Sequence, residues 1–201
     1  DLSSSSSTST GADWGGTHSS SVVNLQNGPS ARSGSDGQDY IAYCFHSVSG
    51  FSKFGTYDGS GSSNSITGLG FRPDTIILKE VDGGDSWQLY DTLRGSGKVV
   101  YPNGNNAEYA GSELTSFDSD GFTVSGNSSN NESGKKYLYA AWKMNTTLNT
   151  TLENSFRNMP YTGTGAELAV TGAGFKPDLV WIINRDGTTW NNVFDSIRGP
   201  N

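Results

Sequence analysis

Apolar residues follow a strand pattern in short segments of this chain, and helical spacing appears nowhere over a convincing length. Residues 40–48 and 75–81 carry apolar side chains on both faces, which is typical of strands covered on both sides. Turns rich in Gly, Asn, Ser and Asp separate such segments. Further strands are expected at 21–25, 51–57, 86–90, 122–124, 179–184 and 189–194.

A long internal repeat organises these segments. Residues 67–79 return as residues 171–183, with Gly-Phe-Arg-Pro-Asp in the first copy and Gly-Phe-Lys-Pro-Asp in the second. Downstream, Asp-Thr-Leu-Arg-Gly at 91–95 returns as Asp-Ser-Ile-Arg-Gly at 195–199. The spacing of about 100 residues indicates a repeated domain, because solenoid units are only roughly 20–50 residues long.

The repeat also predicts how the domains are laid out. Tyr40–His46 resembles Tyr137–Lys143, so the end of one copy precedes the start of the next. We expect domains of about 95–105 residues. Their order is the C-terminal part of a preceding repeat at 1–48, a complete repeat at 51–144, a linker insertion at 145–160 and the truncated N-terminal part of a following repeat at 161–201. The cut point stays open, since a compact unit could also start in the preceding half and end near residue 101.

The fold class follows from the number and spacing of the strands. Many short strands with Gly-rich turns in each copy predict an all-β chain of tandem antiparallel β-sandwiches. The connections at 82–85 and 186–188 contain Asp-Gly, which favours tight hairpins with type I′ turns.

Composition and charge exclude several partners. The net charge is -7 with only 13 scattered Lys and Arg residues, so nucleic acid is not expected as a partner. No apolar run reaches the roughly 18 residues of a membrane-spanning helix, so membrane insertion is not expected. The single cysteine, Cys44, lies in an apolar run and is predicted to be a buried, inert thiol.

Two charged pairs recur in the repeat, Asp91 with Arg94 and Asp195 with Arg198. Such a carboxylate could bind a sugar or serve a glycosidase. No second carboxylate recurs at a fixed place beside it, so we interpret both pairs as structural ion pairs. No catalytic residue is assigned, and the chain is not expected to be an enzyme.

Aromatic residues offer a second kind of site. Trp87, Tyr90 and Trp190 are candidates for stacking against sugar rings, although a polar sandwich also needs aromatic side chains for its core. No metal or cofactor site is predicted, because Asp118 and Asp120 lack the other ligands of a calcium loop and the two histidines, His18 and His46, are too few for zinc. Glycosylation is left open at the four asparagines that fit its pattern, Asn127, Asn131, Asn145 and Asn149.

Several motifs together resemble a known domain. They are Tyr-Ile-Ala-Tyr-Cys-Phe-His at 40–46, Ser-Lys-Phe-Gly-Thr-Tyr-Asp-Gly at 52–59, Gly-Phe-Arg-Pro-Asp at 70–74, Leu-Thr-Ser-Phe-Asp-Ser-Asp-Gly-Phe-Thr-Val at 114–124, Gly-Phe-Lys-Pro-Asp-Leu-Val-Trp-Ile at 174–182 and Phe-Asp-Ser-Ile-Arg-Gly at 194–199. The sequence is similar to an uncharacterised domain that occurs, often in tandem, in large structural proteins of tailed, mainly marine, bacteriophages. The resemblance implies a jelly-roll or concanavalin-like sandwich and a virion fibre, tail or surface component. It implies no catalytic residues.

We therefore expect a non-enzymatic structural or adhesive protein of a phage particle, with a virion or extracellular location. Its expected partners are other copies of itself, other virion proteins and host surface polysaccharide. The alternative is a secreted carbohydrate-binding module or lectin without a virion role. A polysaccharide depolymerase would instead need two carboxylates about 5–10 Å apart across a cleft.

Overall fold

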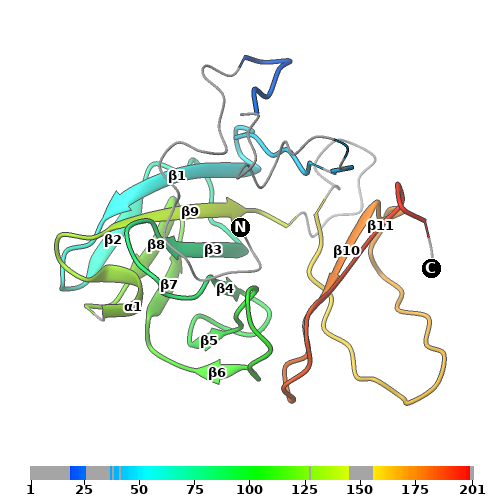
Figure 1. The fold of residues 1–201 in the computed structure, drawn as a ribbon. Helices are drawn as coiled ribbons and strands as arrows, with labels where there is room; N and C mark the ends of the chain where they lie inside the picture. The colour runs from blue at the N-terminus through cyan, green and yellow to red at the C-terminus, as the bar shows by residue number, and fades with distance from the viewer. Residues whose placement is uncertain are drawn as a thin grey trace. The chain divides into compact units, whose positions relative to one another are not determined.

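The computed structural model describes residues 19–25, 37, 39–40, 42–126, 128–144 and 156–199. The chain divides into two compact units, one of Ser7–Phe45 and one of Asp1–Ser6 with His46–Asn201. The described part of the second unit is mostly β structure (Figure 1). Its elements are β1 (Ser52–Asp58), β2 (Asn64–Thr67), β3 (Thr75–Glu80), β4 (Gln88–Asp91), β5 (Lys98–Val99), β6 (Tyr109–Ala110), β7 (Leu114–Asp118), β8 (Gly121–Val124), α1 (Ser128–Asn131), β9 (Lys136–Trp142), β10 (Leu179–Ile182) and β11 (Asn192–Asp195).

Four small antiparallel sheets contain these strands. The largest has the order β1-β9-β3-β4, so that β9 pairs along both of its edges, with β1 and with β3 (Figure 1). A three-stranded sheet has the order β2-β8-β7, and β5 with β6 and β10 with β11 form two-stranded sheets. A membrane-spanning helix is absent from the described part of the chain, where the only helix has four residues.

One apolar core joins the four-stranded and three-stranded sheets. Phe122 of β8 is fully buried and contacts Tyr57 and Tyr139 edge-on, with ring centroids 6.1 and 5.7 Å away. Tyr57 also stacks on Tyr137 at 5.2 Å. Aromatic rings thus supply much of the core in a chain with few aliphatic residues. Its other members include Ile66, Ile76, Leu78, Tyr90, Leu114, Val124 and Ala141.

The opposite face of the four-stranded sheet is also covered. Ile77, Ala140 and Trp142 form a second apolar cluster there, against which Phe156 and Trp181 pack. Trp142 and Phe156 are stacked, with centroids 5.5 Å apart. All six residues of β3 are buried, which confirms the prediction of a strand covered on both faces.

The repeated Thr-Gly-x-Gly-Phe motif has a structural cause. The carboxylate of Asp120, in the β7–β8 turn, accepts hydrogen bonds from the amides of Gly68 at 3.0 Å and Gly70 at 2.6 Å. Both glycines have positive φ, at 85° and 80°, which other residues rarely adopt. Gly172 and Gly174 repeat that geometry in the second copy, at 102° and 81°.

The predicted type I′ turns do not form. A type I′ turn needs positive φ at both central residues, and no residue of 82–85 or 186–188 has it. The connection from β3 to β4 instead spans residues 81–87 and is held by side chains, since Lys79 Nζ donates to Gly83 O at 3.0 Å and Trp87 N donates to Asn103 Oδ1 at 2.9 Å. In the second copy, Asn184 Oδ1 accepts the amides of Asp186 and Gly187.

The prediction of a strand at 40–48 is wrong for the described residues 42–47, which form no strand. The equivalent β9 is paired on both edges, and a strand without such partners has no ladder to stabilise it. Cys44 is consequently exposed rather than buried.

Candidate functional site

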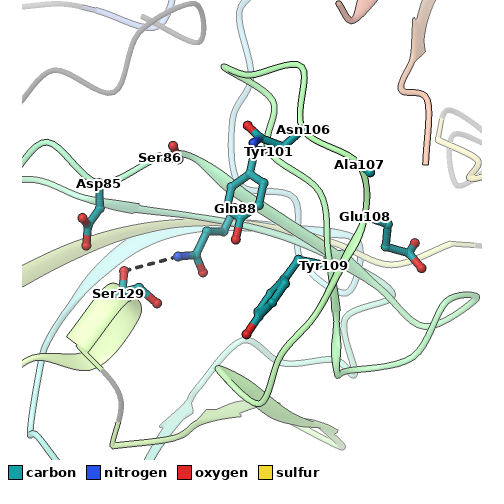
Figure 2. A pocket seen from close by; sticks show the side chains of 9 residues that line it. All are labelled: Asp85, Ser86, Gln88, Tyr101, Asn106, Ala107, Glu108, Tyr109 and Ser129. Atoms are coloured by element: carbon teal, nitrogen blue, oxygen red, sulfur yellow. Dashed lines mark hydrogen bonds between the residues drawn. The ribbon is translucent and has the colours of Figure 1, made fainter. Parts of the chain in front are cut away.

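A polar hollow of about 530 Å³ lies beside the start of β4. Its walls come from the β3–β4 connection, from the loop at 101–108, from Tyr109 at the start of β6 and from α1 (Figure 2). Tyrosine rings, amides, hydroxyls and carboxylates share the lining, which suits a ligand with many hydroxyl groups. The lining residues are Asp85, Ser86, Gln88, Tyr101, Asn106, Ala107, Glu108, Tyr109 and Ser129.

Internal hydrogen bonds fix the floor of the hollow. Gln88 is 4% exposed, its Oε1 accepts the Tyr90 hydroxyl at 2.5 Å and its Nε2 donates to Ser129 O at 3.4 Å (Figure 2). Tyr101 packs against the main core, and burial raises the pKa of its phenol, which keeps it a neutral hydrogen-bond donor. Tyr109 is 54% exposed. The hollow therefore combines a rigid floor with one accessible aromatic ring.

The two carboxylates of the hollow have opposite electrostatic surroundings. Burial, helped by the charge of Glu80, raises the pKa of Asp85. The hydrogen bond from Arg185, supported by Arg94, lowers the pKa of Glu108 although burial acts the other way. Figure 2 shows Asp85 and Glu108 at opposite ends of the hollow, with carboxylates that do not point toward each other. This arrangement differs from the facing pair of a glycosidase.

The structure brings both predicted charged pairs together. Arg94 Nε donates to Asp91 Oδ2 at 2.5 Å, and both side chains are less than 10% exposed. Arg94 also donates to Glu108 Oε2 at 3.3 Å and to Leu89 O at 3.1 Å. Asp195 and Arg198 form the same contact in the second copy, where the Arg198 side chain is 54% exposed. Each pair closes the turn after a strand, because the arginine amide also donates to the aspartate.

The three candidate aromatics have different surroundings. Tyr90 is 1% exposed and belongs to the main core, so its ring has no face free for a sugar. Trp87 is half-buried and packs against the cluster on the outer face of the four-stranded sheet. Trp190 is 71% exposed. Of the three, Trp190 alone offers an open ring, and it lies outside the hollow.

Sequence reasoning missed the contact between the loop at 101–108 and the β10–β11 connection. Arg185 binds Glu108 with two hydrogen bonds, at 2.7 and 3.0 Å, and Glu108 N donates to Arg185 O at 2.7 Å. The Asn191 amide donates to the carbonyls of Tyr101, Pro102 and Gly104. These residues do not recur in the repeat, so the repeat carried no signal for them. The contact ties one wall of the hollow to the following repeat.

The family model described as Domain of unknown function (DUF7483) matches residues 1–145 and 152–201. The chain belongs to the DUF7483 family. No curated protein and no solved structure matches it. The DUF7483 description assigns no activity, so the function has to be inferred from the site.

Metal ligands do not gather in the described part of this DUF7483 chain, where no group of three His, Cys, Asp or Glu side chains could hold an ion. His18 lies outside the described residues. Asp118 accepts the hydroxyls of Ser116 and Thr123, both at 2.7 Å, and Asp120 binds the glycine amides described above. Both aspartates thus have structural hydrogen bonds.

One glycosylation candidate is enclosed by the fold. Asn131 is fully buried, its Oδ1 accepts Ser60 N at 2.9 Å and its Nδ2 donates to Ser125 O at 2.8 Å. A glycan on this nitrogen would displace those contacts. Asn127, Asn145 and Asn149 lie outside the described residues.

Acid is expected to break the contact between Glu108 and Arg185. Because the folded-state pKa of Glu108 is lowered, its charged contact is complete above the ordinary carboxyl pKa of 4.5 and is lost as the pH falls through the lower, folded value. We expect the Arg185 Nε–H resonance, followed by NMR, to lose its hydrogen-bonded shift only below pH 4.5. The Arg185 resonance of a Glu108→Gln variant should not titrate. A wild-type resonance unchanged down to about pH 2 would contradict the assignment.

Proposed function

We propose that this chain is a non-enzymatic structural and adhesive component of a phage particle, and that its complete repeat (residues 51–144) binds host surface polysaccharide in the polar hollow. One observation supports this binding site: the side chains of Tyr101 and Tyr109 and the amides of Gln88 and Asn106 line the same cavity. Sugars are recognised by such pairs of aromatic faces and fixed polar groups. The virion or extracellular location rests on the motif resemblance.

Repetition supports an adhesive role. A shallow polar site binds weakly, but several linked copies can raise the overall affinity about 10²–10⁴-fold when they engage one polymer together. In this proposal the two principal sheets, which share one core, are the layers of a β-sandwich of jelly-roll or concanavalin-like type. Other copies of the chain and other virion proteins would be its structural partners, with neither nucleic acid nor a membrane involved.

The second candidate is a secreted carbohydrate-binding module or lectin without a virion role. The same hollow supports this second candidate, because a sugar could bind there whether or not the protein belongs to a phage particle. Mass spectrometry of purified particles separates the two functions. Detection of the parent protein in the particle supports the first, and its presence only in the medium supports the second.

Binding is tested on an array of bacterial polysaccharides with the 201-residue chain. Tyr109→Ala is expected to lower affinity about 5- to 30-fold, because a stacked ring contributes roughly 1–2 kcal/mol. Tyr161→Ala is the matched control, since Tyr161 is 48% exposed and lies outside the hollow.

The outcomes of this experiment are distinct. Loss of binding in Trp190→Ala but not in Tyr109→Ala would move the site to the β10–β11 connection. No binding by the folded chain would overturn adhesion and leave a spacer role. Release of reducing ends from a bound polysaccharide would overturn the non-enzymatic part of the proposal.

A further inference from the structure

The loop at 101–108, which forms one wall of the hollow, has few backbone hydrogen bonds within its own repeat. Among the described residues, two of its amides donate to backbone carbonyls. Gly104 N donates to Tyr101 O at 3.0 Å inside the loop, and Glu108 N donates to Arg185 O of the following repeat at 2.7 Å. The second half of the loop therefore has its backbone bond to the β10–β11 connection.

Side chains of the complete repeat hold the loop at residues 103 and 108. Asn103 Oδ1 accepts the amide of Trp87 at 2.9 Å, and Glu108 Oε2 accepts Arg94 Nη1 at 3.3 Å. Neither contact reaches residues 104–107, although two of these, Asn106 and Ala107, line the hollow. The position of this part of the wall thus depends on contacts from elsewhere.

The β10–β11 connection supplies such contacts. Asn191 Nδ2 donates to three carbonyls of residues 101–104, at distances of 2.8 to 3.2 Å. Asn105 Nδ2 donates in the other direction, to Thr188 O at 3.3 Å. Because one amide group binds three carbonyls, it fixes how the loop bends between residues 101 and 104.

Arg185 fixes the direction of the Glu108 carboxylate. Its Nε and Nη2 donate to the two oxygens of that carboxylate, at 2.7 and 3.0 Å. A guanidinium that binds both oxygens orients the carboxylate as well as neutralising it. Figure 2 shows the Glu108 carboxylate directed away from Gln88 and Tyr101. Arg185 therefore holds this charge at the edge of the hollow, away from its floor.

We propose that the following repeat completes the binding site of the repeat before it. Arg185 and Asn191 act as positioning residues, which hold the loop at 101–108 in the conformation that binds polysaccharide. A loop that is already ordered costs the ligand less free energy on binding, so the hollow binds more tightly when these two residues are present. This inference rests on the proposed function of the hollow.

The dependence is specific to this junction between repeats. Residues 67–79 align with residues 171–183, so that Arg185 corresponds to Val81. Valine has no charge and cannot bind a carboxylate. The complete repeat therefore cannot form the same ion pair with a repeat that precedes it.

A double variant of the 201-residue chain, Arg185→Gln with Asn191→Ala, tests the proposal. Neither residue lines the hollow, so both substitutions leave its surface unchanged. Hydrogen exchange of the Glu108 amide is expected to become about 5- to 30-fold faster, because the loop opens more often without these contacts. Affinity for the bacterial polysaccharide that the wild-type chain binds is expected to fall about 3- to 10-fold.

Lys176→Gln with Asn192→Ala is the matched control in the same repeat. Lys176 is exposed, and Asn192 Nδ2 donates within the hairpin, to Trp190 O at 3.5 Å. We expect neither the exchange of the Glu108 amide nor the affinity to change. Exchange of the Arg198 amide, which donates to Asp195 Oδ1 at 2.8 Å, reports in every variant whether the hairpin is folded.

A third variant tests whether the geometry of the arginine matters. Arg185→Lys keeps the charge and loses the two parallel hydrogen bonds, so its exchange and affinity should lie between those of the wild type and the double variant. Unchanged exchange in the double variant would overturn the positioning role. Faster exchange with unchanged affinity would overturn the dependence of binding on the following repeat. If the wild-type chain bound no polysaccharide, the proposed function would fail, and the exchange rates would still decide whether the hairpin positions the loop.

Discussion

Replacing Arg94 by methionine is expected to lower the free energy of unfolding of the complete repeat by about 3–5 kcal/mol. The Arg94 side chain is 7% exposed and neutralises Asp91 and Glu108, which are 8% and 10% exposed. Methionine keeps much of the apolar stem and removes the charge, so Asp91 is left without its charged partner in a poorly solvated place, while Glu108 keeps Arg185. Urea denaturation followed by circular dichroism measures the loss.

Lys136→Met controls for the removal of a charge from the same sheet. Lys136 Nζ binds Asp58 at 2.7 Å, but the two side chains are 48% and 79% exposed, so water replaces the lost partner. No measurable change is expected for this variant. If Arg94→Met were as stable as Lys136→Met, the buried pair would have no structural role, and Asp91 would again be a candidate for sugar binding.

Tyr90→Ala is expected to cost about 3–5 kcal/mol of unfolding free energy. Tyr90 is 1% exposed in the main core, so alanine leaves a cavity, and the hydroxyl that binds Gln88 is lost as well. Tyr90→Phe separates the two effects, because it removes only the hydrogen bond, worth about 1 kcal/mol.

Tyr109→Ala provides the comparison for this second prediction. Tyr109 is 54% exposed, so its removal should leave the unfolding free energy nearly unchanged. This also ensures that a loss of polysaccharide binding in Tyr109→Ala reports on the hollow and not on folding. A Tyr90→Ala protein as stable as Tyr109→Ala would show that Tyr90 is not a core residue.

The strands were predictable where a segment and its partners lie in the same repeat. β1, β3, β4 and β8 form within the expected segments or one residue beyond them, because alternation and turn residues act locally. Residues 42–47 have the same pattern as β9 and form no strand, since a strand depends on neighbours that the pattern does not supply. The prediction that Cys44 is buried was wrong for the same reason.

The candidate site was less predictable than the strands. Asp91 and Arg94 were recognisable because the pair recurs at fixed spacing, and the structure brings them together. The hollow combines Asp85, Gln88 and Ser129 with the loop at 101–108 and the start of β6, which are segments distant in sequence. Neither residue spacing nor composition indicates that these segments lie together, so the hollow could not be predicted from the sequence and is seen only in the folded chain.

The register of β1 against β9 decides how a stretched array of these repeats would bear force. Ser52, at the start of β1, faces Trp142, at the end of β9, so the chain enters and leaves the complete repeat at the same end of two neighbouring strands. Tension applied through the chain would pull these two ends apart and load the ladder one hydrogen-bond pair at a time, from Ser52 toward Asp58. The β1–β9 hydrogen bonds would therefore break one after another instead of all together in shear, so such a repeat would act as an extensible link rather than a stiff rod.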